Sequence, residues 1–358
     1  IAPRTSESTG VSRGQGVRTC TAPEGERGRE REREREREEG RGAMAAASEA
    51  VVPRPAELLA KVARLRAAGA RELQVIMDFD HTLTRFVLPD GRAAPMCHDV
   101  VERSPLMPTA FHDGYAKLWA DQDVALKEGR WSWEEWWRRS HQLMVDHGLR
   151  RAWLPEMIRA SGLACRTGCK ELFKLLEAHE VPSLVVSAGL TPVIREVLAA
   201  EGVPTHDLRV LANDMQFDED SGVLSSFSEP PLHSHAKDSV GFRLADYFAG
   251  IARRHVVILG DSVSDCDCLV NIPGIDETIR VGFFNRARGV DRSKYEDVYD
   301  VVLTNEGLQA VEDLDLSLVL ELLAGLVSPQ NGPTGELCGF LRLPLEAAAV
   351  AAVAATAA

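Results

Sequence analysis

The chain lacks any long hydrophobic run, since no stretch approaches the roughly 18 consecutive apolar residues that a membrane-spanning helix needs. No secretory signal peptide is expected at its start. Its seven cysteines are few, odd in number and scattered, which favours a reducing compartment over a disulfide framework. We therefore expect a cytoplasmic globular protein, and its 358 residues with a hydrophobic content of 45% are ample for a sizeable core.

Positive charge is also in short supply. The 41 lysines and arginines face 54 aspartates and glutamates, which gives a formal net charge of -13. An acidic surface repels polyphosphates, so the composition argues against nucleic-acid partners and against binding to anionic membranes. A phosphorylated ligand would need a locally positive site or a bound cation. The sequence leaves the oligomeric state open.

Both ends of the chain are poorly suited to a core. Residues 1–43 include a nearly pure Arg-Glu alternation from Glu26 to Glu39, which predicts a disordered, charged tail. Two interpretations stay open for this tail: an interaction segment, or translated upstream sequence that is not native, since Met44 would be a natural start. Residues 329–358 end in an Ala/Val/Thr-rich stretch and are predicted to be a low-complexity tail.

Between these ends, short apolar runs alternate with helical patterns. The runs that predict buried strands are Leu73–Phe79, Ser183–Ser187, Arg209–Ala212, His255–Leu259, Thr278–Val281 and Val298–Leu303. The helical patterns are Ala56–Ala68, Lys170–His179, Pro192–Glu201 and Leu308–Leu323. This alternation predicts an α/β fold with a parallel sheet covered on both faces, and with ligands at the carboxyl ends of the strands.

One long stretch interrupts the alternation. Between Asp78 and Ser183 there is no clear strand pattern, all six tryptophans of the chain lie there, and Trp133–Val145 has helical spacing. We therefore predict that residues 90–165 form an inserted helical cap over the ligand-binding edge of the sheet. Residues 55–89 and 166–328 would form the α/β core.

Carboxylates follow two of the predicted strands. Asp78 and Asp80 come at the end of the first strand, and Asp261 and Asp265 follow His255–Leu259. Because parallel strands end at the same edge of a sheet, these acids should lie close together and repel one another. A hard cation such as Mg²⁺ among them would remove that repulsion.

Two further features suit a bound anion. Another strand ends in Ser187-Ala188-Gly189, where a hydroxyl and the backbone N–H groups of small residues can reach an anion. Lys237 lies between this segment and Asp261 in the chain and adds a positive charge. Together with the acids, these residues predict a phosphate site that uses a cation.

These residues resemble the four motifs of the haloacid dehalogenase (HAD) superfamily of phosphohydrolases. The motifs are D-x-D-x-T, a strand-end Ser or Thr, a lysine, and G-D-x-x-x-D, and they stand here in the expected order as Asp78–Thr82, Ser187, Lys237 and Gly260–Asp265. The chain is more closely similar to the cytosolic 5′-nucleotidase III (pyrimidine 5′-nucleotidase) family over most of residues 72–305. The segments that carry this similarity are Leu73–Phe86, Cys97-His98, Glu135–His141, Val186–Gly189 and Phe217–Leu224.

The resemblance implies a Rossmann-like HAD core and a Mg²⁺-dependent 5′-nucleotidase. Its substrates would be nucleoside 5′-monophosphates, either pyrimidine nucleotides such as UMP and CMP or 7-methylguanosine monophosphate. Asp78 would be the nucleophile that forms an aspartyl-phosphate, and Asp80 the general acid and base. Mg²⁺ would be held by the Asp78 carboxylate, the Asp80 backbone carbonyl and Asp261, with Asp265 supporting this shell.

The resemblance also assigns the substrate contacts. Ser187, Ala188 and Lys237 would bind the phosphate, and Ser140 in the cap would contact the substrate. The candidates for the carboxylate or amide that contacts the base are Asp121, Gln122 and Asp123.

Two tryptophans of the predicted cap, Trp136 and Trp137, are candidates for stacking on the base. Their helical spacing fits the core of the cap equally well. Two alternative functions stay open: a HAD phosphatase on another small phosphomonoester, and a non-catalytic binding module. The binding module would be expected to lack a motif aspartate, and all of them are present.

Overall fold

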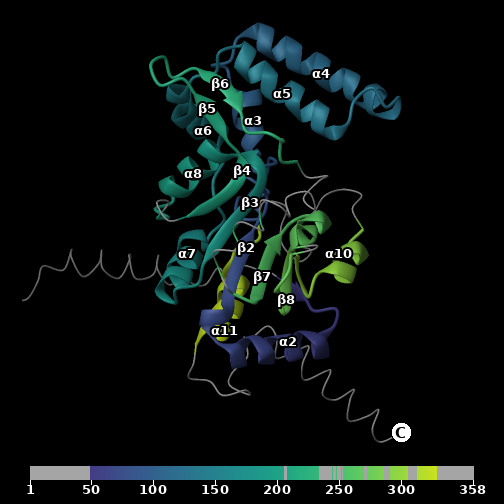
Figure 1. Cartoon of the computed structure of the whole chain (residues 1–358), viewed down its shortest axis with the longest axis vertical. Helices are drawn as coiled ribbons and strands as arrows, with labels where there is room; N and C mark the ends of the chain where they lie inside the picture. The colour runs from purple at the N-terminus through teal and green to yellow at the C-terminus, as the bar shows by residue number, and fades with distance from the viewer. Residues whose placement is uncertain are drawn as a thin grey trace, which may run out of the picture. The chain divides into compact units, whose positions relative to one another are not determined.

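The apolar runs assemble into one sheet. In the part of the chain that the computed structural model describes, this sheet has seven strands in the order β1-β9-β8-β7-β2-β3-β4. Figure 1 shows β2, β7 and β8 side by side in its centre. The strands are β1 (Glu49–Val51), β2 (Leu73–Met77), β3 (Ser183–Leu190), β4 (Arg209–Asn213), β7 (His255–Gly260), β8 (Glu277–Phe284) and β9 (Val301–Thr304).

The structure describes residues 49–204, 208–233, 244, 247, 251, 253–269, 272–285, 291–304 and 313–328. The two predicted tails, 1–43 and 329–358, and the predicted phosphate ligand Lys237 lie outside the described residues. The chain divides into two units, Ile1–Ala47 and Ser48–Ala358, and every element described below belongs to the second.

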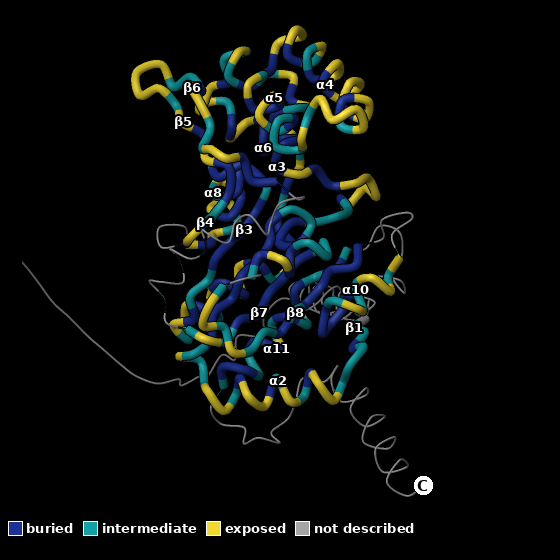
Figure 2. Tube along the Cα trace, turned by 45° about the vertical axis from the view of Figure 1, so that its right-hand side comes forward, coloured by how far each residue is buried: buried dark blue, intermediate teal, exposed yellow. Residues whose placement is uncertain are grey.

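The central strands are buried on both faces. All five residues of β2 are buried; Val75 and Met77 belong to the larger hydrophobic cluster, whereas Ile76 belongs to a second cluster on the opposite face. Figure 2 shows this burial along the sheet, with the exposed positions on outer helices such as α2 (Pro55–Ala68). Burial on both faces explains why these strands have continuous apolar runs rather than a polar-apolar alternation. The predicted α/β fold is confirmed.

Six of the seven strands run parallel, and β1 alone is antiparallel, to β9. The predicted strands are all present, each with ends within three residues of those expected. The edge strand β1 was not predicted, because three residues carry too short a pattern. The core helices are α2, α7 (Cys169–Ala178), α8 (Thr191–Ala200), α10 (Ser293–Val298), α11 (Ser317–Val327) and the 3-10 helices η1 (Ala70–Glu72) and η4 (Val263–Leu269).

The last helix begins later than predicted. The sequence predicted a helix over Leu308–Leu323, but α11 begins at Ser317, residues 313–316 are not helical, and residues 305–312 lie outside the described residues. The Asp315 carboxylate accepts hydrogen bonds from the backbone N–H and the hydroxyl of Ser317. A side chain that bonds nearby backbone in this way competes with a helix interior and marks its start.

The long insertion forms a helical layer. Its elements are α3 (Cys97–Glu102), α4 (Thr109–Lys127), α5 (Trp133–Asp146), η2 (Arg151–Trp153) and α6 (Leu154–Ser161). A two-stranded hairpin, β5 (Met215–Phe217) and β6 (Leu224–Phe227), comes from the second half of the chain and packs on α5. Figure 1 draws the hairpin beside these helices, away from the central strands. No helix among the described residues has both the length and the apolarity needed to cross a bilayer.

The interior of the helical layer is aromatic. Trp136 on α5 is 2% exposed and meets the rings of Trp119, Trp133 and Trp137 edge to face. The Ser132 hydroxyl accepts the backbone N–H of Glu135 at 3.1 Å and so caps the N-terminus of α5. The tryptophans of this layer therefore build much of its core.

We expect Trp136→Ala to lower the free energy of unfolding by about 3–5 kcal/mol, because it removes the largest buried side chain of the helical layer. Urea denaturation followed by circular dichroism measures this change. Val124→Ala, at a 50% exposed position of α4, is the control and should change the stability by less than about 0.5 kcal/mol. Equal effects of the two substitutions would contradict the assignment of Trp136 to the core.

Candidate active site

Three carboxylates meet at the carboxyl edge of the sheet. Asp78 follows β2 and Asp261 follows β7, and these two strands are parallel neighbours with Met77 opposite Leu259. Asp265 lies in η4, directly after β7. One oxygen from each of the three carboxylates lies within 4.8 Å of the others, and Asp78 and Asp265 are buried.

The loop after β7 is shaped by close contacts. The Asp265 carboxylate accepts the Ser262 N–H at 2.8 Å, and a Cβ on Gly260 would overlap that carboxylate, so the position needs glycine. The hydroxyls of Tyr295 and Tyr299 donate to the backbone carbonyls of Asp261 and Ser262, both at 2.5 Å. These tyrosines could not be identified from the sequence, because they act through contacts with the backbone of a distant segment.

The three carboxylates suit a metal ion. They are hard oxygen donors, close enough to share one cation, and without a cation their charges would repel. Of the predicted metal ligands, Asp78 and Asp261 are therefore brought together, and Asp265, predicted as a supporting residue, joins them. The side chain of Asp80 is not part of this group and has a different partner.

Asp80 is held by the first helix of the helical layer. Its carboxylate accepts the backbone N–H of Cys97 at 2.9 Å. Burial, together with the negative charge of Asp78, raises the pKa of Asp80 to about 7, whereas the hydrogen bond from Cys97 acts in the opposite direction. A carboxyl group with a pKa near neutrality can both give and take a proton, as a general acid and base must.

The end of β3 lies beside this helix. The Ser187 hydroxyl is buried and accepts the Gly189 N–H at 3.0 Å. A Cβ on Gly189 would lie 2.8 Å from the Cys97 sulfur, so only glycine permits this packing. The Asn213 side chain, which the sequence analysis missed, donates to the carbonyls of Ala188 at 2.7 Å and of Gly189 at 3.2 Å. These contacts fix the backbone of the predicted phosphate-binding segment.

The predicted substrate residues of the cap lie on α5. Ser140 is fully buried, Trp136 is enclosed by other tryptophans, and Trp137 is only partly buried. Of the three α4 candidates for a base contact, Gln122 is buried, whereas Asp121 and Asp123 are exposed.

A pair of buried histidines joins parts of the helical layer. His98 of α3 and His141 of α5 approach at 3.2 Å between their Nε2 atoms, and His141 stacks on Phe227 of β6 with 4.0 Å between ring centroids. One of the two Nε2 atoms must donate and the other must accept, so a single hydrogen lies between these two atoms. Burial lowers the pKa of His141 to about 3 and also lowers that of His98.

The same layer contains a partly buried acid that was not singled out from the sequence. Glu102 of α3 accepts a hydrogen bond from the Tyr115 hydroxyl of α4. Burial raises the pKa of Glu102 to about 7. This acid therefore lies inside the layer, unlike the exposed acids of α4.

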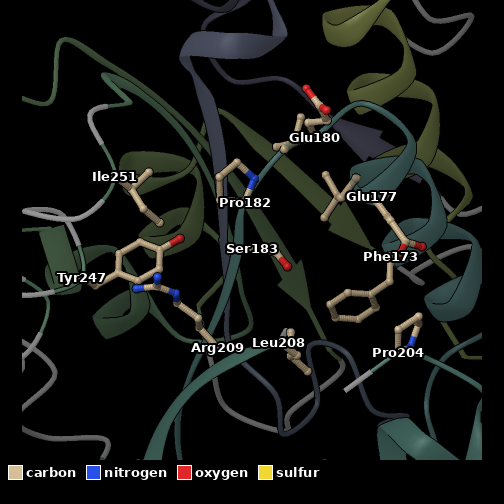
Figure 3. Close-up of a pocket in the computed structure, with 12 residues that line it drawn as sticks. Phe173, Glu177, Glu180, Pro182, Ser183, Pro204, Leu208, Arg209, Tyr247 and Ile251 are labelled. Atoms are coloured by element: carbon tan, nitrogen blue, oxygen red, sulfur yellow. The ribbon is translucent and has the colours of Figure 1, made fainter. Parts of the chain in front are cut away.

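One described cavity lies elsewhere in the fold. It has a volume of about 310 Å³ and opens at the amino ends of β3 and β4, beside Ser183 and Arg209. Figure 3 shows Phe173, Pro182 and Tyr247 around it. Because the carboxylates lie at the carboxyl ends of the strands, this cavity is not part of the candidate site.

Comparison with known proteins gives a consistent result. The family profile described as pyrimidine 5′-nucleotidase (UMPH-1) matches residues 81–319. A 7-methylguanosine phosphate-specific 5′-nucleotidase of Gallus gallus is 30% identical over 282 residues, which cover 75% of this chain and 96% of that protein. The Homo sapiens protein of the same name is 29% identical over 270 residues, which cover 73% of this chain and 89% of that protein.

A solved structure is also similar. The crystal structure of cytosolic 5′-nucleotidase IIIB bound to cytidine matches with a TM-score of 0.67 and 25% sequence identity. The match covers 77% of this chain and 92% of that one.

Gly260→Ala should disturb the acidic site, because the added methyl group has no room beside the Asp265 carboxylate. We expect a loss of about 1–3 kcal/mol in stability from overpacking. We also expect metal affinity to fall about tenfold or more, since this contact orients a carboxylate of the site. Calorimetric titration of the metal-free protein with Mg²⁺ measures the affinity. Gly114→Ala, where the methyl would meet only the flexible end of Leu143, is the control, and an equal loss in both variants would contradict the prediction.

The share of the free energy of unfolding that depends on His141 should fall as the pH drops from about 6.5 toward 3. In this range His141 is protonated in the unfolded chain. In the folded chain it stays neutral, because its pKa is lowered. The unfolded state therefore binds one more proton, and the free energy of unfolding falls by up to about 1.4 kcal/mol for each unit that the pH drops. His141→Phe should retain the stacking on Phe227 and lose this share of the pH dependence. Urea denaturation of both proteins at pH 7 and pH 5 measures the difference, and parallel losses of stability would contradict the prediction.

Proposed function

This chain belongs to the pyrimidine 5′-nucleotidase (UMPH-1) family and is a 5′-nucleotidase of the HAD superfamily, and from that premise we propose its metal, its mechanism and its substrates. The metal ion is Mg²⁺, and the reaction converts a nucleoside 5′-monophosphate to a nucleoside and inorganic phosphate. The observation that carries the proposal is the convergence of Asp78, Asp261 and Asp265 beside a carboxyl group, Asp80, whose pKa is raised to about 7.

In the first half of the reaction, an Asp78 carboxylate oxygen attacks the phosphorus and the bond from phosphorus to the ribose 5′ oxygen breaks. Asp80 gives its proton to that leaving oxygen, so the nucleoside leaves as a neutral alcohol and the phosphoryl group stays on Asp78. A Mg²⁺ ion bound by Asp78, Asp261 and the Asp80 backbone carbonyl would neutralise phosphoryl charge. Asp265 supports this shell through the loop that it orders.

In the second half, Asp80 takes a proton from a water molecule as that water attacks the aspartyl-phosphate. Phosphate is released and Asp78 is regenerated. The raised pKa of Asp80 suits both halves, because its carboxyl group must change its protonation state once in each. The backbone N–H of Cys97 keeps its carboxylate in place between the two steps.

Phosphate binding is assigned to the end of β3. The Ser187 hydroxyl and the N–H of Ala188 are proposed donors to the phosphate oxygens, and the Asn213 bonds to the carbonyls of Ala188 and Gly189 orient this backbone. Lys237, outside the described residues, is proposed to balance the charge of substrate and intermediate.

The helical layer together with the β5–β6 hairpin is proposed to be the cap that selects the base. This boundary extends the predicted cap, 90–165, because the hairpin contacts α5 and its Phe227 stacks on His141. Ser140 and Trp137 are proposed substrate contacts. Trp136 has a smaller part, since its ring is enclosed by other tryptophans.

Two classes of base, 7-methylguanine and the pyrimidines, are proposed on the strength of the similar proteins. The relatives are named for 7-methylguanosine phosphate, and the similar crystal structure contains cytidine. Both 7-methylguanosine monophosphate and the pyrimidine nucleotides CMP and UMP are therefore proposed substrates. A further relative from Caenorhabditis elegans is named a putative cytosolic 5′-nucleotidase 3, which supports the cytoplasm as the proposed location.

Phosphate release from CMP, UMP, 7-methylguanosine monophosphate and phosphoserine, with Mg²⁺ and with EDTA, tests the proposal. We expect turnover of at least one of the three nucleotides that stops with EDTA and falls by a factor of about 10⁴ or more in Asp78→Asn, which lacks the nucleophile. The ratio of kcat/KM values among the nucleotides ranks the bases. Asp146→Asn, at an exposed position of α5, is the control and should retain full activity. Turnover of phosphoserine alone would favour the alternative phosphatase, and no turnover at all would favour a binding module.

A further inference from the structure

Arg166 is the centre of a buried network beside the candidate site. It lies where the chain returns from the helical layer to α7, and its side chain is fully buried. Its guanidinium makes five hydrogen bonds, as many as it has N–H groups. The acceptors are the carbonyl of Thr82 at 3.0 Å, the carbonyl of His81 at 2.6 Å, the carbonyl of Leu314 at 2.8 Å, the Asn285 side-chain oxygen at 2.7 Å and the Asp313 carboxylate at 2.6 Å.

Two of these acceptors belong to the loop that carries Asp80. The carbonyl of His81, the next residue, receives a second hydrogen bond from the Asn285 side chain at 3.0 Å. His81 has a φ of 61°, in the left-handed region, which costs a non-glycine residue on the order of 1–3 kcal/mol. A conformation of this kind persists only where the surroundings hold it, and here Arg166 and Asn285 do so from one side.

The network joins segments that are far apart in the chain. Asn285 follows the end of β8, and Asp313 precedes α11. The Asp313 carboxylate also accepts the N–H of Phe86, so it holds both the arginine and the far end of the same loop. The guanidinium carbon lies 5.0 Å from the centroid of the Phe283 ring, which adds a cation–π contact.

The positive charge of Arg166 also interacts with the acidic cluster. Burial lowers the pKa of Arg166, and the negative charges of Asp313 and Asp261 act in the opposite direction. Asp261 is one of the three carboxylates of the candidate site. The buried positive charge of Arg166 interacts electrostatically with Asp261 and so offsets part of the repulsion among the three carboxylates.

We infer that Arg166 is a positioning residue for the reaction: its guanidinium, with Asn285, holds the backbone of residues 80–82 so that Asp80 is aimed at the metal ion and the substrate. This inference rests on the proposed Mg²⁺-dependent reaction. A planar fork is required, because a lysine has one nitrogen with three N–H groups and cannot reach five acceptors spread over three segments. Arg166→Lys therefore keeps the charge and breaks the geometry.

A second arginine provides a matched control. Arg253 donates to the backbone carbonyls of Ala70 at 2.7 Å, Leu73 at 3.1 Å and Glu180 at 2.8 Å, at the amino ends of the strands. Arg253→Lys breaks the same kind of contact at the opposite edge of the sheet. A purely stabilising role for Arg166 would make the two variants behave alike.

The experiment compares wild type, Arg166→Lys and Arg253→Lys by Mg²⁺ titration calorimetry of the metal-free proteins and by kcat and KM for the best nucleotide. In Arg166→Lys we expect the Mg²⁺ dissociation constant to rise about 10- to 100-fold, as for other residues that orient ligands, and kcat to fall more than KM changes. In Arg253→Lys we expect both quantities to stay within about twofold of wild type, even where the melting temperature falls.

Asn285→Ala tests the same inference without removing the buried charge. It deletes one of the two donors to the His81 carbonyl, and we expect a smaller rise in the Mg²⁺ dissociation constant, of about threefold or more, with a folded protein. This variant decides the matter if Arg166→Lys does not fold.

Two results would count against the inference in different ways. Mg²⁺ affinity and kcat in Arg166→Lys and Asn285→Ala that match Arg253→Lys would overturn the positioning role and leave the proposed function intact. A wild-type protein that binds no Mg²⁺ and hydrolyses no nucleotide would overturn the proposed function, and the inference with it.

Discussion

The repulsion among Asp78, Asp261 and Asp265 is the constraint around which the carboxyl edge is built. Three carboxylates with oxygens within 4.8 Å of one another oppose folding unless the surrounding structure holds them. The parallel pairing of β2 with β7 does much of this, since the Asp78 N–H donates to the Leu259 carbonyl at 2.9 Å. Hydrogen bonds from Ser262, Tyr295 and Tyr299 complete the support. The same crowding favours the binding of a cation, because a positive ion reduces the repulsion among the carboxylates.

The sequence was sufficient for the parts of the molecule that depend on local patterns. Buried strands such as β2 and β7 are continuous apolar runs, and an acid directly after such a run must lie at the edge of the sheet, so the meeting of Asp78 with Asp261 followed from topology. The start of α11 was wrong because the pattern of apolar residues continues through Asp313 and Asp315, whose side chains bond nearby backbone instead. The edge strand β1 was missed because its partner, β9, is remote in the chain.

The residues that hold the backbone of the site in place could not be predicted from the sequence, for a different reason. Arg166, Asn213 and Asn285 act by donating to backbone carbonyls, and every residue has such a carbonyl. No spacing or residue type in the chain marks which carbonyl will be met after folding. Trp136 illustrates the converse case: its residue type suited a base contact and a core position equally, and only the packing around it in the structure distinguishes them. The contact between the β5–β6 hairpin and α5 was similarly hidden, because the hairpin comes from a part of the sequence far from the insertion.

The helix α3 has two contacts with the carboxyl edge of the sheet. Its first residue, Cys97, supplies the N–H that holds the Asp80 carboxylate, and its sulfur packs so closely on β3 that only a glycine fits at position 189. The same helix carries His98, which bonds His141 in the middle of the helical layer. Through these contacts α3 connects the Asp80 carboxylate and the end of β3 to the interior of the helical layer.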